Sequence, residues 1–229
     1  MEFTQPLVRG RLLRRLNRFV AEVTVNGGLE QAHVPNTGRL RELLVAGATV
    51  YLTPVAGNGR KTAWDLTLVQ KDDVLCAIDT RLPAKLLLEP EVARTLDIPA
   101  ADARLRIEAA YGKHRFDLLV EDDQGRLWVE AKTVSLVVDR RGYFPDAPTQ
   151  RGTSHVRTLT DLVKAGGRGA VLLMVLRHDA AVVHPNEATD PAFASALRQA
   201  AAAGVLVRGI RYRVTLQGVY FDCEVPVEL

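Results

Sequence analysis

Residues 115–132 read RFDLLVEDDQGRLWVEAK, with two apolar runs on either side of a polar turn. Short apolar runs joined by an Asp-Asp-Gln-Gly segment are typical of two antiparallel strands in a hairpin. If the turn is centred between Asp123 and Gln124, then Asp117 on the first strand lies opposite Glu130 on the second. We therefore expect these two carboxylates to share one face of a sheet.

Lys132 joins this pair of carboxylates, because residues two apart on a strand point to the same face. Like charges opposed across two strands are destabilising, and a divalent cation would neutralise them. Magnesium is commonly held by one or two carboxylates together with water and phosphate oxygens, and a nearby lysine can orient an attacking water. The stretch thus favours a site in which Asp117 and Glu130 hold Mg²⁺ or Mn²⁺ and Lys132 assists catalysis.

The other face of this hairpin is expected to be turned to the core, because its residues are all apolar: Phe116, Leu118, Val129 and Ala131. The alternative is an exposed hairpin in which Lys132 merely pairs with one of the acids. Such exposed pairs contribute only about 0–1 kcal/mol.

Beyond the hairpin, hydrophobic periodicity predicts a domain in which helices cover a sheet. The expected elements are a helix over 82–96, strands over 104–110, 115–121 and 126–134, a helix over 153–165, a buried strand over 169–176, a helix over 191–203 and strands within 205–223. This mixture of strands and helices indicates an α/β fold.

The first part of the chain has a different pattern, in which short apolar runs alternate with Gly- and Asn-containing turns. It predicts five strands and one short helix: strands near 8–25, 29–34, 48–55, 63–70 and 74–79, and a helix near 39–45. A small closed barrel hides the edges of five short antiparallel strands, and the oligonucleotide-binding (OB) barrel is the commonest such form. We place the domain boundary near residue 80, with an OB-fold domain over 1–80 and an α/β domain over 81–229.

Positive charge is concentrated in the barrel, since residues 1–82 carry 11 basic and 8 acidic groups and the rest of the chain is neutral. A basic run, followed by Phe19, falls on the first strand or its approach: Arg9, Arg11, Arg14, Arg15 and Arg18. Arginine forks suit phosphates, and a groove with positive charge and a stacking ring suits single strands. The alternative is a solvated basic edge that prevents strand-to-strand aggregation.

Three further residues are candidates for contact with nucleic acid. Tyr143 lies with Phe144 in a Gly- and Pro-punctuated loop over 142–146, where the rings either wedge against a base or cover the core. Arg151 and His155, four residues apart, face the same side of the next helix and are expected to reach phosphate. A basic cluster on a solvated helix face is the alternative for this pair.

Asp117 and the Glu-x-Lys of residues 130–132 resemble the central motif of the PD-(D/E)XK nuclease superfamily, over about 83–180. The whole chain resembles the sugar fermentation stimulation protein A family, through segments that match family signatures. These segments are HVPNTG at 33–38, Tyr111-Gly112, VEAKTV at 129–134, GYFPDA at 142–147, Arg151-Gly152 and His155.

This resemblance implies an N-terminal OB fold, a nuclease-like C-terminal domain and DNA binding without sequence preference. It implies that Asp117 and Glu130 are metal ligands, Lys132 is the catalytic-type lysine and Glu108, on the preceding strand, is a third acid. The chain departs from the expected family pattern at Gln150, where a glutamate is expected. Two functions follow: a Mg-dependent DNA phosphodiesterase, or a non-catalytic DNA-binding regulator linked to sugar (maltose) metabolism.

Composition excludes several other classes of protein. Cys76 and Cys223 lack the spacing of a thiolate zinc site and are expected to be buried free thiols. The longest apolar run, 170–176, is far shorter than the roughly 20 residues of a membrane helix, so we expect a cytoplasmic protein without a membrane partner. DNA, single- or double-stranded, is the expected partner, and oligomeric state is left open.

Overall fold

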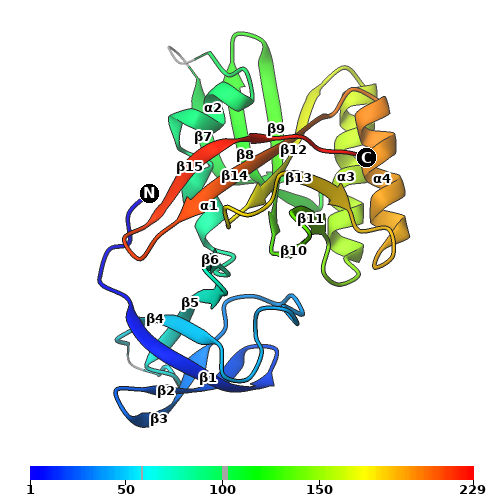
Figure 1. Ribbon diagram of the computed structural model, residues 1–229. Coiled ribbons are helices and arrows are strands. Elements are labelled where there is room, and N and C mark those ends of the chain that lie inside the picture. Colours follow the sequence, from blue (N-terminus) through cyan, green and yellow to red (C-terminus); the bar gives the residue numbers. More distant parts are fainter. Residues whose placement is uncertain (58, 100–102) are drawn as a thin grey trace.

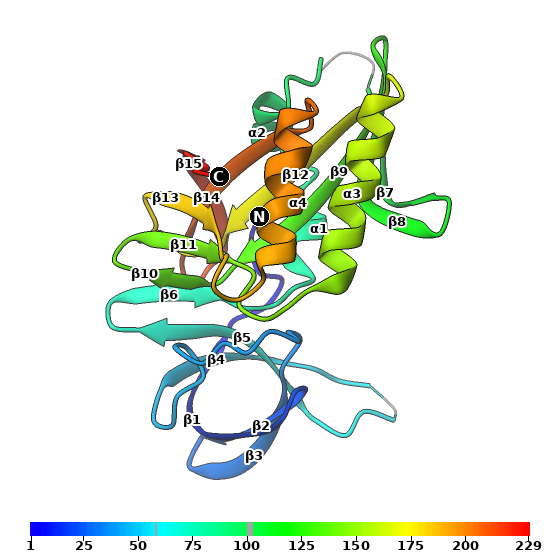
Figure 2. The same cartoon turned by 90° about the vertical axis from the view of Figure 1, so that its right-hand side faces the viewer.

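The computed structural model describes residues 1–57, 59–99 and 103–229. Its N-terminal part is a closed barrel of five strands, seen as a ring in Figure 2. The strands are β1 (Val8–Asn17), β2 (Val20–Val25), β3 (Gly28–His33), β4 (Thr49–Pro54) and β5 (Trp64–Lys71). β1 pairs with β2 and β4, β4 pairs with β5, and a short parallel pairing of β3 with β5 closes the ring. The predicted OB-type barrel is therefore confirmed.

Three details of the barrel differ from the prediction. The single strand expected over 8–25 is two strands, because the chain turns at Arg18 and Phe19. The strand expected at 74–79 is β6 (Val74–Ala77), which pairs on the edge of β5 outside the ring. The helix expected at 39–45 is a turn: Leu40 has a φ of +50°, a left-handed conformation that no helix continues through.

The second part of the chain is a mixed sheet with helices on both faces (Figure 1), so the predicted α/β fold is confirmed. Its strands, in spatial order, are β15 (Val219–Val225), β14 (Leu206–Val214), β12 (Arg168–Val175), β9 (Gly125–Val134), β8 (His114–Asp122) and β7 (Arg104–Tyr111). The central strands β9, β12 and β14 run parallel, and the others antiparallel to their neighbours. β12 is apolar and buried because both faces of the sheet are covered.

Helices α3 (Gln150–Lys164) and α4 (Pro191–Ala202) pack on one face, and α1 (Leu82–Leu86) and α2 (Pro90–Thr95) on the other. The continuous helix predicted over 82–96 is interrupted before Pro90. Proline has no N–H and forces the preceding residue away from helical geometry, and Glu89 is extended.

A small third sheet lies beside α3 and α4. It consists of β10 (Leu136–Val138), β11 (Arg141–Phe144) and β13 (Val182–Pro185), with β11 and β13 parallel. The loop predicted over 142–146 is therefore wrong for residues 142–144, which belong to β11. The pairing partner β13 lies about 40 residues further along the chain, where local pattern cannot identify it.

The barrel packs directly against the second sheet. Leu68 and Ala77 belong to the core beneath α1 and α2, and the Ala77 N–H donates to the carbonyl of Leu176 (2.9 Å). The first residues of the chain also reach the second part, where Glu2 pairs with Gly218. None of the helices in the described ranges has the length and apolar character of a membrane span.

Candidate active site

The β8–β9 hairpin has the register predicted from the sequence. Leu118 pairs with Val129, as the predicted register requires, and Asp117 and Glu130 directly follow this last pair of the ladder. The regular ladder of backbone hydrogen bonds ends at this pair. Beyond it, a side chain links the two strands, because Oδ2 of Asp117 accepts a hydrogen bond from the backbone N–H of Ala131 (2.7 Å). Asp117 is thus tied to the strand that carries Glu130.

One prediction about the back of this hairpin is wrong. Phe116 and Leu118 were expected to share a face, but Phe116 lies in the core beneath α3 and Leu118 in the core on the opposite face. The Phe116 ring packs against Trp128 and His155, with centroids 5.8 and 5.5 Å away. The alternation is interrupted at Asp117, which follows the last β8–β9 pair and which the pairing of β8 with β7 skips together with Glu108.

Glu130 lies on β9 with only 3% of its side chain exposed. Its Oε1 accepts a hydrogen bond from the Lys132 ammonium and lies 2.7 Å from Nδ1 of His155 on α3. Its Oε2 is buried and has no hydrogen-bond partner. Burial raises the pKa of Glu130, but the hydrogen bond with His155 and the charge of Lys132 together hold it below its ordinary value.

The pKa of Asp117 moves in the opposite direction. Burial and the neighbouring charge of Glu130 raise it to about 6, against the opposing effects of the Ala131 N–H and the Lys132 ammonium. Two carboxylates in one low-dielectric site thus have environments that separate their pKa values. The effect of Glu130 on the pKa of Asp117 is the repulsion between neighbouring carboxylates that the sequence predicted.

A divalent cation fits this donor set. An unpartnered, buried carboxylate oxygen costs free energy, and a cation would satisfy it while relieving the repulsion that raises the pKa of Asp117. Within the described ranges no group of three or more Asp, Glu, His or Cys side chains has metal-binding geometry. The two carboxylates suit Mg²⁺, because this ion is commonly held by one or two carboxylates and completes its shell with water and phosphate.

The cluster opens into a cleft between the barrel and the second sheet, with a volume of about 590 Å³. Asp117 and Lys132 line it from the sheet, and Arg18 and Gly38 line it from the barrel. A hydrogen bond joins the barrel to the second part of the chain beside this cleft: the Leu40 N–H donates to Oδ2 of Asp146 (3.0 Å). Residues 36–38 and 144–147, which come from two of the quoted sequence signatures, therefore meet at this cleft.

Glu108 lines the same cleft from β7. Its side chain is exposed and forms an ion pair with Arg115 (3.2 Å). Its φ of +51° is a left-handed conformation that costs on the order of 1–3 kcal/mol for a residue of this kind. Strain of this type concentrates at functional sites, and here it lies on the strand next to Asp117.

The five arginines of the basic run have different environments. Arg9 and Arg11 are exposed on β1, and Arg14 is paired with Glu22 (2.5 Å). Arg15 donates to four backbone carbonyls, those of Arg18, Asn36, Gly38 and Arg39, at 2.7–3.0 Å. Arg15 thus fixes the loop that forms the cleft wall, whereas Arg18 lines the cleft itself.

The other residues predicted to contact nucleic acid also have different environments. Tyr143 stacks on His184 (centroids 5.6 Å apart), and Phe144 packs edge-on against Phe193 while lining the cleft. Arg151 is exposed at the start of α3, as is Gln150. His155 is buried with its ring against Glu130, so it faces a carboxylate rather than solvent.

Sequence reasoning missed two arginines beside the cleft. Arg39 and Arg41 line a neighbouring hollow of about 530 Å³ together with Arg18, and Ala147 and Pro148 of the second part also line it. These arginines follow the HVPNTG segment, but the segment was expected to lead into a helix. Both side chains are instead exposed on a turn, which the predicted helix did not indicate.

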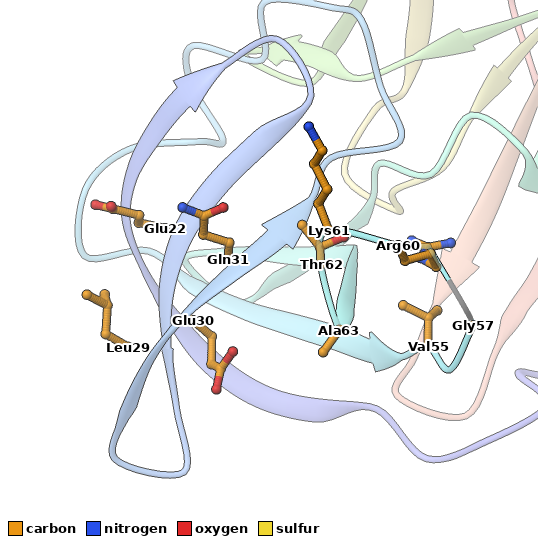
Figure 3. Close-up of a pocket in the computed structure, with 10 residues that line it drawn as sticks. All are labelled: Glu22, Leu29, Glu30, Gln31, Val55, Gly57, Arg60, Lys61, Thr62 and Ala63. Carbon is orange, nitrogen blue, oxygen red and sulfur yellow. The ribbon is translucent and has the colours of Figure 1, made fainter.

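Another hollow, of about 570 Å³, lies on the barrel between the β2–β3 hairpin and the β4–β5 connection (Figure 3). Glu22 and Glu30 line it from the hairpin, and Arg60 and Lys61 from the connection. Its charges are mixed, and it contains none of the predicted catalytic residues. Residue 58, in the same connection, lies outside the described residues.

Comparisons with known proteins cover the whole chain. The model of the "SfsA N-terminal OB domain" matches residues 13–78, and that of the "Sugar fermentation stimulation protein RE domain" matches residues 79–218. A sugar fermentation stimulation protein homologue of Acetivibrio thermocellus is 44% identical over 99% of both chains. One of Natranaerobius thermophilus is 39% identical over 98% of this chain and 95% of its own.

A solved structure of a protein with the same family name is also similar to this chain in three dimensions. The SfsA protein of Pyrococcus furiosus, in complex with Ca²⁺, superposes with a TM-score of 0.91. It is 32% identical in sequence, and the match covers 100% of this chain and 98% of that one.

Proposed function

The chain belongs to the sugar fermentation stimulation protein (SfsA) family, and from this premise we propose that it binds DNA without sequence preference and hydrolyses phosphodiester bonds with Mg²⁺ or Mn²⁺. The observation that carries the proposal is the pair of opposed carboxylates beside a cleft, with a buried Glu130 oxygen that lacks a partner. The Ca²⁺ complex of the Pyrococcus furiosus relative supports a divalent-cation site in this chain.

In this proposal Asp117 and Glu130 hold the cation, which would supply Lewis-acid stabilisation of the charge that develops on the phosphate. Asp117 is held in place by the Ala131 N–H, and Glu130 by Lys132 and His155. These bonds preorganise the carboxylates, so that little reorganisation is needed during the reaction. His155 is thus a positioning residue.

Lys132 has two roles in the proposed reaction. Its side chain is only 15% exposed, and it contacts Glu130 while lining the cleft. At the scissile phosphate it would orient the attacking water and stabilise negative charge, which is worth more in a site that excludes bulk water. Glu108, at the same cleft, is the proposed third acid.

DNA binding in this proposal depends on arginine contacts with phosphates. Arg18 lines the cleft, and Arg9, Arg11 and Arg151 are exposed. Contacts to phosphate position a nucleic acid but carry no sequence information directly, which accounts for binding without sequence preference.

A specific observation favours a second candidate function, a non-catalytic DNA-binding regulator linked to sugar (maltose) metabolism. Lys132 already occupies Oε1 of Glu130, and within the described part of the chain no cluster of three metal-ligating side chains is present. A nuclease-like site with so few acidic ligands also suits a protein that binds DNA without cleaving it.

Cleavage assays separate these two functions. Purified protein is incubated with plasmid and with single-stranded DNA in Mg²⁺, Mn²⁺ or EDTA. Lys132→Ala is tested beside Lys164→Ala, a matched change at an exposed lysine at the end of α3. We expect cleavage that requires the metal, falls on the order of 100-fold or more in Lys132→Ala and persists in Lys164→Ala. Retained DNA binding without cleavage in every condition would contradict the nuclease and support the regulator.

A further inference from the structure

The tip of the β1–β2 hairpin has an unusual composition for a turn. Arg18 and Phe19 form the two-residue connection between Asn17 and Val20, which pair with each other. Phe19 is 49% exposed, although turn tips are usually built from small polar residues. A large apolar ring at this position contributes little to the barrel core.

Hydrogen bonds hold this tip in one conformation. The Phe19 N–H donates to Oδ1 of Asn17 (2.8 Å), and the Phe19 carbonyl accepts from the N–H of Val34 (2.7 Å). The Arg18 carbonyl accepts from the Arg15 guanidinium (2.7 Å). The aromatic ring is therefore presented to solvent by a fixed backbone.

The tip adjoins the hollow lined by Arg39 and Arg41, because Arg18 lines both that hollow and the cleft beside Asp117. Among the ion pairs of the described residues, none involves Arg18, Arg39 or Arg41. Three arginines without carboxylate partners, of which Arg18 directly precedes the exposed Phe19 in the chain, have the chemistry of a single-strand binding path. Such paths combine cationic contacts to the backbone with aromatic faces on which bases stack.

The cleft itself favours one strand over two. Lys132 lines it with only 15% of its side chain exposed, and Glu130, which Lys132 contacts, is 3% exposed. Residues 36–38 of the barrel and 144–149 of the second part both line it, and the bond between Leu40 and Asp146 links these two walls. A duplex keeps its bases paired inside a rigid double helix, whereas a single strand can enter such a cleft and leave its bases free to stack.

We propose that the nucleic acid taken by this cleft is single-stranded DNA, with a base stacked on Phe19 and the backbone running over Arg18, Arg39 and Arg41 toward Asp117. This inference rests on the DNA-binding function proposed above and specifies its substrate class. It assigns a binding role to Phe19, Arg39 and Arg41.

The test is fluorescence anisotropy with a labelled single strand and with the duplex of the same sequence, in EDTA and again in Ca²⁺. The wild-type protein is expected to bind the single strand more tightly. Phe19→Leu should weaken single-strand binding roughly 5- to 100-fold with little effect on the duplex, and Phe19→Trp should retain it, because stacking needs a π face. Leu29→Ala, at an exposed apolar residue near the other end of the β2–β3 hairpin, is the matched control and should change nothing.

A second measurement, the salt dependence of single-strand affinity, tests the role of the arginines. Arg39→Gln with Arg41→Gln should flatten the log–log dependence of single-strand affinity on salt by about 1.4, for two phosphate contacts. Arg126→Gln with Arg213→Gln removes the same charge from exposed positions elsewhere and should leave the slope nearly unchanged.

The outcomes distinguish this inference from the function on which it rests. Tighter binding of the duplex, or unchanged single-strand binding in Phe19→Leu, would overturn the inference while DNA binding stands. If neither DNA form binds, both are overturned. Single-strand binding that depends on Phe19 without any cleavage supports the inference and contradicts only the nuclease.

Discussion

The Glu130 side chain is contacted by residues from two elements, Lys132 on β9 and His155 on α3. Lys132 is two residues away on the same strand, and its proximity follows from strand geometry alone. His155 comes from α3, and its ring lies 2.7 Å from the same carboxylate oxygen. The hairpin contact was predictable from the sequence, whereas the helix contact depends on how α3 packs on the sheet.

The two cysteines are expected to differ in reactivity. Cys76 is buried, and burial raises the pKa of its thiol to about 12, so almost no thiolate is present at pH 8. Cys223 is partly exposed. With a thiol-reactive chromogenic disulfide, we expect only Cys223 to react in the folded protein and both thiols to react in denaturant. Fast reaction of Cys76 in the native state, tested in Cys223→Ser, would contradict this.

Asp65 makes stability depend on pH in the acidic range. It is buried, and burial raises its pKa, but a hydrogen bond from Arg81 and the charges of Arg81 and Arg60 hold the pKa below its ordinary value. A depressed folded-state pKa stabilises the protein above the unfolded pKa, and this contribution is lost as pH falls through the folded one.

Asp65→Asn should therefore lower the free energy of unfolding by about 1–3 kcal/mol at pH 7. The difference from wild type should shrink as pH falls below about 4, because the unfolded-state carboxylate is protonated there first and the folded-state carboxylate follows at lower pH. Urea unfolding at several pH values measures this. A difference that stays constant from pH 7 to pH 3 would show that the charge of Asp65 is not its cause.

At the scale of elements, a single carboxylate organises the starts of two helices. Asp190 caps α4 by accepting from the Phe193 N–H (2.9 Å), and its other oxygen accepts from the Thr149 N–H (2.7 Å). Thr149 in turn caps α3, since its hydroxyl accepts from Gly152 (3.1 Å). The beginnings of α3 and α4 are therefore linked.

We expect Thr149→Ala to destabilise the protein by about 1 kcal/mol, the typical cost of a lost N-cap. Asp190→Ala should cost more, about 2–3 kcal/mol, because the buried N–H of Phe193 and the partly buried N–H of Thr149 both lose their acceptor. The double variant should cost less than the sum, since the two caps share a contact. Chemical unfolding measures all three values, and strict additivity would contradict the linkage.

Elements with strong local signals were predicted well. The β8–β9 hairpin has a turn and two apolar runs within 18 residues, and its register is confirmed. The helix expected over 39–45 was wrong because Leu40 is held in a left-handed conformation beside Asp146, a residue more than 100 positions away. Helical periodicity in such a short segment is a weak signal against a tertiary contact.

At the scale of the whole molecule, the barrel and the second sheet share apolar contacts. Leu68 and Ala77 are buried in the core beneath α1 and α2, and the N-terminal residues bridge to the β14–β15 connection. Separation of the two parts would expose these apolar side chains to water. We therefore expect the chain to unfold as one cooperative unit.

The two tryptophans provide the measurement, because Trp64 lies in the barrel and Trp128 in the second sheet. Trp64→Phe and Trp128→Phe each leave one fluorescent reporter. The urea midpoints from the two reporters should coincide, after correction for the stability of each variant, and should match circular dichroism. A barrel reporter that unfolds at clearly lower urea would show that the two parts unfold separately.

The sequence by itself determined the type of each domain, the register of the central hairpin and the residue types of the candidate site. These follow from turn chemistry and from the periods of strands and helices, which act over a few residues. Only the tertiary structure decided that Arg15 binds backbone carbonyls, that His155 is buried against Glu130 and that Gly38 and Asp146 line one cleft. The physical reason is that these contacts join segments far apart in the chain, and their geometry depends on how the barrel and the helices pack on the sheet.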